Sequence, residues 1–87
     1  MKNKVLKSYF LLKILSDSSW YIIEFKVESD SVKRYEWDCF SPSKKQVFVY
    51  KNTHNARLDW KGLINRKFVH VTKSQILDYG LHLGKFK

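Results

Sequence analysis

The 87-residue chain has few of the residues that cross-link a fold or interrupt its helices and strands: one cysteine, one proline and three glycines. A single cysteine, Cys39, excludes an internal disulfide and indicates a reducing, cytoplasmic compartment, with Cys39 expected to be a small buried hydrophobe. A single proline, Pro42, excludes a proline-rich linker. No internal repeat or low-complexity tract divides the sequence, so residues 1–87 are expected to form one domain.

Long apolar runs are also missing. The apolar run near the N-terminus is short, contains Lys13 and is followed by no small-residue cleavage site, so a signal peptide is not expected. No segment approaches the ~18 apolar residues that a membrane span requires. We therefore expect no membrane partner. Because 44% of the residues are hydrophobic and 16% aromatic, the chain has enough apolar material to fold.

Acidic residues are scarce in the second half of the chain. Residues 1–38 carry seven cations and six anions, whereas residues 39–87 carry ten cations against Asp59 and Asp78 and hold +8 of the net charge of +9. Such a field attracts polyanions. Lysine outnumbers arginine fourteen to three, as in the AT-rich coding genomes of many phages and low-GC bacteria. Lysine contacts phosphate as a mobile point charge, whereas bidentate hydrogen bonds to base edges usually come from arginine. Low sequence selectivity is therefore expected.

Aromatic and β-branched residues recur in short runs separated by turn formers, which is typical of antiparallel strands. The predicted strands are Ser8–Leu15, Trp20–Glu28, Val32–Phe40, Gln46–Lys51 and Lys67–Val71. Within the second strand one face is expected to meet the core and the other water, because two sets of residues alternate: Tyr21, Ile23, Phe25 and Val27 with Ile22, Glu24, Lys26 and Glu28. The short turns between these runs predict a meander.

Two later segments carry helix signals. Asn52–Asn65 is compatible with a short helix capped by Asn55 and ending before Gly62, or with a long loop. The pattern T-x-x-Q at Thr72 and Gln75 predicts the start of a C-terminal helix, and Gly84 suits its C′ position.

The whole pattern predicts an α+β, β-rich fold: a curved antiparallel sheet of about five strands, as in a small SH3-like or OB-like open barrel, with a C-terminal helix. Such a sheet has edges, and one of them could be covered in a homodimer.

A basic and aromatic segment is the best candidate site. On Gln46–Lys51, Phe48 and Tyr50 share one face and Val47 and Val49 the other, so the rings form a stacking platform if the valines face the core, and fill the core if they do not. Trp60 either stacks on a base or packs against the sheet as part of the core. The candidate phosphate contacts are Lys44, Lys45, Lys51, Arg57, Lys61, Arg66 and Lys67, and the candidate stacking groups are Phe48, Tyr50 and Trp60.

Other chemistry has weaker signals. His54, His70 and His82 could supply a general acid and base for RNA cleavage, with Arg57 or Lys67 stabilising the phosphate, but each histidine sits where a structural role is the more common one. The cysteine and histidines lack the paired spacing of a metal site. We expect neither an enzyme nor a cofactor.

The leading expectation is a non-enzymatic protein that binds RNA or single-stranded nucleic acid with low sequence specificity. It rests on charge and aromatic content, because the signatures of the RNA-recognition motif, the KH domain and the zinc finger are missing. The alternative is a small protein-interaction module, such as a phage-encoded inhibitor that docks onto a host protein or ribonucleoprotein. A small basic ribonuclease is the third option.

Overall fold

A computed structural model describes residues 5–17, 19–41 and 43–83, with side chains described between residues 6 and 78 of these ranges. Five strands and two helices follow one another in these described ranges: β1 (Val5–Ile14), β2 (Trp20–Glu28), β3 (Val32–Asp38), β4 (Lys45–Tyr50), α1 (Thr53–Asn65), β5 (Val69–Val71) and α2 (Lys73–Leu83). The turn expected at Pro42 and the C′ position of Gly84 lie outside the described residues.

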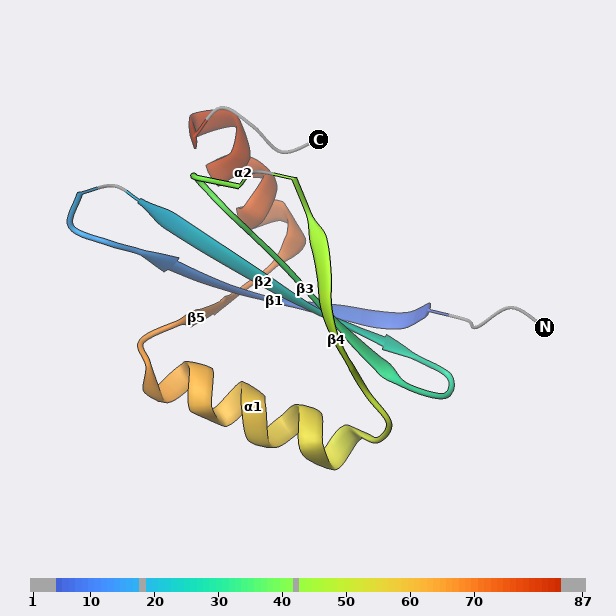
Figure 1. The fold of residues 1–87 in the computed structure, drawn as a ribbon. Coiled ribbons are helices and arrows are strands. Elements are labelled where there is room, and N and C mark those ends of the chain that lie inside the picture. Colours follow the sequence, from blue (N-terminus) through green and yellow to red (C-terminus); the bar gives the residue numbers. More distant parts are fainter. Residues whose placement is uncertain (1–4, 18, 42, 84–87) are drawn as a thin grey trace.

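The strands form one antiparallel sheet in the order β4-β3-β2-β1-β5 (Figure 1). The β-rich α+β fold, the five strands and the C-terminal helix are therefore confirmed. Closure of the sheet into a barrel is not confirmed, because in the described part of the chain β4 and β5 lie at opposite edges of the sheet. The central strands β1 and β2 pair over nearly their whole length, with Leu11 opposite Ile23.

The two helices lie on opposite faces of the sheet (Figure 1), so the core has two layers. The layer under α1 contains Leu11, Ile23, Phe25, Val32, Tyr50, Ala56 and Leu63. The layer under α2 contains Phe10, Leu12, Trp20, Ile22, Trp37, Val71 and Ile76, with Cys39 partly buried against it.

The expectation that one face of Trp20–Glu28 meets water is wrong. Ile22 is completely buried and Glu24 is 3% exposed. Both lie on the face that α2 covers, because the chain returns over that face after β5. Strand alternation correctly separated the two faces, but it could not tell that each face has its own helix.

The undecided segment Asn52–Asn65 is a helix. Asn52 rather than Asn55 is the N-cap: its side chain accepts a hydrogen bond from the Asn55 backbone N–H at 3.0 Å. The helix continues through Gly62 and ends at Asn65. Lys67 then adopts a positive φ of 76°, a conformation that allows the chain to reverse into β5.

The start of α2 agrees with the predicted capping box. The Gln75 backbone N–H donates to Thr72 Oγ1 at 3.2 Å, and the Thr72 backbone N–H donates to Gln75 Oε1 at 2.7 Å. Ile76, one residue later, is buried against the sheet. The cap therefore fixes where α2 begins and directs its apolar residue toward the core.

Candidate nucleic-acid interface

Helix α1 has an apolar inner side and a cationic outer side. Ala56 and Leu63 are buried and Trp60 is half-buried, so these residues hold the helix against the sheet. Arg57 and Lys61 are exposed. Because they are four residues apart, they lie on one stripe of the helix, one turn from each other.

Cations also flank both ends of this helix. We define the α1 basic surface as the exposed residues Lys51, Arg57, Lys61, Arg66 and Lys67. Lys51 precedes the N-cap, and Arg66 and Lys67 follow the last helical residue. Between residues 51 and 67 the sequence has a single acid, Asp59.

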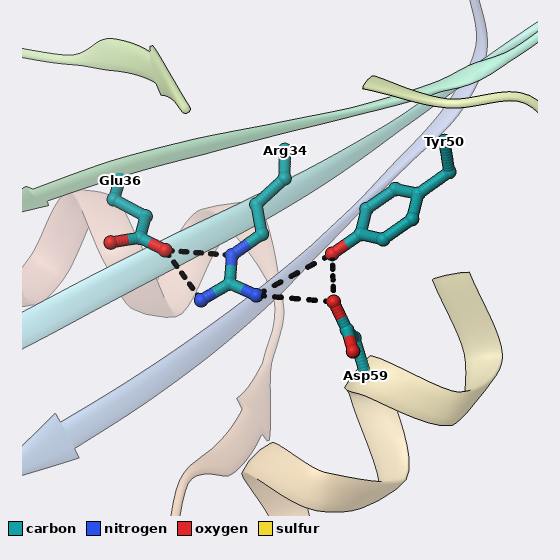
Figure 2. A network of polar contacts seen from close by, with 4 residues as sticks. All are labelled: Arg34, Glu36, Tyr50 and Asp59. Carbon is teal, nitrogen blue, oxygen red and sulfur yellow. Dashed lines mark hydrogen bonds and ion pairs between the residues drawn. The ribbon is translucent and has the colours of Figure 1, made fainter. Parts of the chain in front are cut away.

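Asp59 points toward the sheet rather than along the basic surface (Figure 2). Its carboxylate accepts a 2.5 Å hydrogen bond from the Tyr50 hydroxyl, and the Arg34 guanidinium lies 3.5 Å away. Half of the Asp59 side chain stays exposed, and the single charge of Arg34 is shared between Asp59 and Glu36, so this network holds two anions against one cation. The α1 basic surface is positive because its five cations outnumber the one acid between them.

Arg34 joins the three elements of this network. Its guanidinium contacts Glu36 at 2.5 and 2.6 Å on β3 and the Tyr50 hydroxyl at 3.4 Å on β4 (Figure 2). Burial and the hydrogen bond donated to Asp59 raise the pKa of Tyr50 above its ordinary value, although Arg34 opposes this. The neutral phenol thus ties α1 to the edge of the sheet.

The predicted site residues divide between the two faces of the sheet. Lys44 forms an ion pair with the buried Glu24, and its ammonium lies over the rings of Tyr35 and Trp37 on the α2 side. Lys44 therefore does not join the α1 basic surface. Lys45 is exposed at the start of β4.

The stacking platform of Phe48 and Tyr50 is not formed. The two rings share a face, with centroids 4.6 Å apart, but Tyr50 is 3% exposed while Phe48 is 55% exposed. Tyr50 is buried because α1 crosses that part of the sheet, so its assignment as a stacking group is wrong. Val47 and Val49 are exposed as well, since β4 is an edge strand.

Trp60 belongs to a ring cluster between α1 and the sheet. It lies edge-on to Tyr9 at 6.0 Å, to Phe25 at 5.4 Å and to His70 at 5.4 Å between ring centroids. The same four rings line a cleft of about 480 Å³, to which Arg57 contributes from α1. Tyr9 was not predicted as a site residue, and His70 was considered as a catalyst or a structural residue but not as part of a ring cluster, because neither residue lies near Trp60 in the sequence.

The two histidine side chains that the structure describes lie on different elements. His54 is exposed in the first turn of α1 and His70 is exposed on β5 beside Trp60, while the His82 side chain lies outside the described residues. Within the described ranges, no three His, Cys, Asp or Glu side chains gather in a way that could hold a metal ion. None of the described helices is long and apolar enough to cross a membrane.

Comparison of the chain with protein-family models, with curated proteins and with solved structures gives no match.

Proposed function

We propose that this protein binds RNA or single-stranded nucleic acid without catalysing a reaction, and that the α1 basic surface supplies the phosphate contacts. The observation that carries the proposal is the charge arrangement of the α1 basic surface: five exposed cations on α1 and at its two ends, with the one intervening acid turned toward Tyr50 and Arg34. Basic surfaces of this kind supply the sequence-independent part of nucleic-acid affinity.

The chemistry of these cations favours low sequence specificity. Lys51, Lys61 and Lys67 carry mobile ammonium groups that contact phosphates as point charges, while the guanidinium of Arg57 can hold a phosphate through two hydrogen bonds. Contacts to phosphate position a strand but read no sequence. The protein should therefore bind strands of different sequence with similar affinity.

The salt dependence of binding tests the proposal. A labelled oligoribonucleotide is titrated with protein at several salt concentrations, and the logarithm of affinity is plotted against that of the salt concentration. Each phosphate contact on a single strand contributes a slope of about −0.7. The double variant Arg57→Gln/Lys61→Gln should therefore flatten the slope by about 1.4 and weaken binding to all sequences.

A matched double variant controls for net charge. Lys26 stacks over Tyr35 on the α2 side of the sheet, and the exposed Lys73 begins α2. Lys26→Gln/Lys73→Gln removes the same charge from the opposite face and should change the slope much less. Equal effects of the two double variants would contradict a site on α1, and no salt-dependent affinity in the wild type would contradict the function.

A protein-interaction module is the second candidate, and the exposed edge strand favours it. Within the part of the chain that the structure describes, β4 has one hydrogen-bonded neighbour, β3, and presents Val47, Phe48 and Val49 to solvent between Lys45 and Lys51. An edge of this kind can add an extended segment of another protein. Pairing with a second copy would bring like charges together, so a partner strand with apolar side chains between acidic ones fits better.

Phe48→Asp tests this second function, because it places a repulsive charge in the apolar edge without removing a buried group. A protein captured by the wild type in high salt and lost by Phe48→Asp would support docking on β4 if the captured segment is acidic and extended. Capture by both proteins would contradict it. The far-UV circular dichroism of the variant serves as the folding control.

A further inference from the structure

The cleft beside Trp60 has an apolar interior and a cationic mouth. Of its lining residues, Phe25 is buried, Tyr9 and Trp60 are half-buried, and Arg57 and His70 are exposed. Its volume of about 480 Å³ falls within the range of small-molecule sites, about 300 to 1,000 Å³. Its lining residues come from β1, β2, β3, β5 and α1, and one of them, Arg57, is part of the α1 basic surface. Figure 1 shows α1 lying beside these strands.

The charges around the cleft all favour an anion. Arg57 belongs to both the cleft and the α1 basic surface. Thr53, the first residue of α1, also lines the cleft, at the positive end of the helix dipole. The Lys7 ammonium lies 5.2 Å from the centroid of the Tyr9 ring. Among the described residues, no Asp or Glu lines the cleft.

Resting on the function proposed above, we propose that this cleft takes one unpaired base of the bound strand, with the adjoining phosphate held by Arg57. The rings of Trp60, Tyr9 and His70 supply apolar surface on which a base of any identity can stack. Arg57 supplies two donors to the phosphate that follows the base. A flat ring attached to an anion is the ligand that matches an aromatic interior with a cationic mouth.

This assignment separates the protein from one that binds phosphates alone. A base enters the cleft only if it is free of a pairing partner, so the protein should prefer single strands to a duplex of the same length. A polymer that carries the same phosphates without bases should bind less tightly. Stacking of one base corresponds to a difference of about 5- to 150-fold in affinity.

The test compares oligouridylate with an abasic oligomer of equal length, using the same fluorescent label and salt concentration. Oligouridylate should bind at least about 5-fold more tightly. Two histidine variants locate the effect: His70→Ala removes an exposed ring of the cleft, while His54→Ala removes an exposed ring from α1 that does not line it. His70→Ala should lower the preference for oligouridylate several-fold, and His54→Ala should leave it unchanged.

Three other results would contradict either the base-binding cleft or the proposed function. Equal binding of the two oligomers by the wild type would overturn the base-binding cleft and leave phosphate binding intact. A preference for bases that survives in His70→Ala, when circular dichroism shows a native fold, would place stacking elsewhere, for example on Phe48, and would also overturn the cleft. Failure to bind either oligomer would overturn the proposed function itself.

Discussion

Replacing Lys44 with methionine is expected to destabilise the fold by about 3 kcal/mol. Glu24 is buried, and its Oε1 accepts no hydrogen bond from the described residues; it pairs with the Lys44 ammonium instead. Methionine keeps an aliphatic stem over Tyr35 and Trp37 but removes the charge, so the Glu24 carboxylate is left buried and uncompensated.

The magnitude follows from the burial of the two partners. Breaking a buried ion pair by removing one partner costs about 3 to 5 kcal/mol. The lower end applies because 41% of the Lys44 side chain is exposed, whereas Glu24 is nearly inaccessible. Domains of this size have a free energy of unfolding of about 5 to 15 kcal/mol, so urea denaturation followed by circular dichroism should resolve the loss easily.

Two further variants make this prediction specific. Lys45→Met removes the neighbouring charge from an exposed position and should change stability by less than about 0.5 kcal/mol. Glu24→Gln combined with Lys44→Met removes both charges and should recover most of the loss. If Lys44→Met were as stable as Lys45→Met, the structural role assigned to the pair would be wrong, and Lys44 would be available for binding phosphate.

Four other substitutions probe the remaining architecture. Tyr50→Phe should change the pH dependence of stability: because the folded state raises the pKa of Tyr50, its contribution is complete below its ordinary value of 10.0 and is lost as the pH rises further. The stability of the wild type relative to Tyr50→Phe, measured by urea denaturation, should therefore fall above pH 10.0, and a constant difference would contradict the buried phenol. Ile22→Ala should cost about 2 to 5 kcal/mol, whereas Leu77→Ala on the exposed side of α2 should cost less than about 1 kcal/mol; similar losses in thermal unfolding would argue against a core under α2. Asn52→Ala should lower stability by about 1 kcal/mol through loss of the α1 cap, and an unchanged melting temperature would contradict it.

The strands could be predicted from the sequence because their signal is local. Alternation of β-branched and aromatic residues, together with polar turns, placed all five strands, and the Thr72–Gln75 pattern placed α2. α1 was harder. Its Asn52 cap is followed by a segment with only two buried residues, Ala56 and Leu63, so packing against the sheet decides its conformation more than periodicity does.

Of the candidate site, the sequence predicted the exposed cations but not the contacts between side chains. Exposure of the cations on α1 follows from their type. The pairing of Lys44 with Glu24, however, joins the residue before β4 to a residue of β2 and has no local signature. Tyr50 is buried because α1 returns over β4 and offers it Asp59. The cleft brings together Tyr9 and Trp60 from distant parts of the chain, an arrangement that only the three-dimensional packing creates.

We propose above all that the cations of the α1 basic surface bind the phosphates of a nucleic-acid strand. The most direct measurement is the salt dependence of oligoribonucleotide affinity for the wild type, for Arg57→Gln/Lys61→Gln and for Lys26→Gln/Lys73→Gln. We expect a steep inverse dependence for the wild type, a slope flatter by about 1.4 for the α1 variant, and little change for the control. An affinity that is absent, or one that both double variants weaken equally, would contradict the claim.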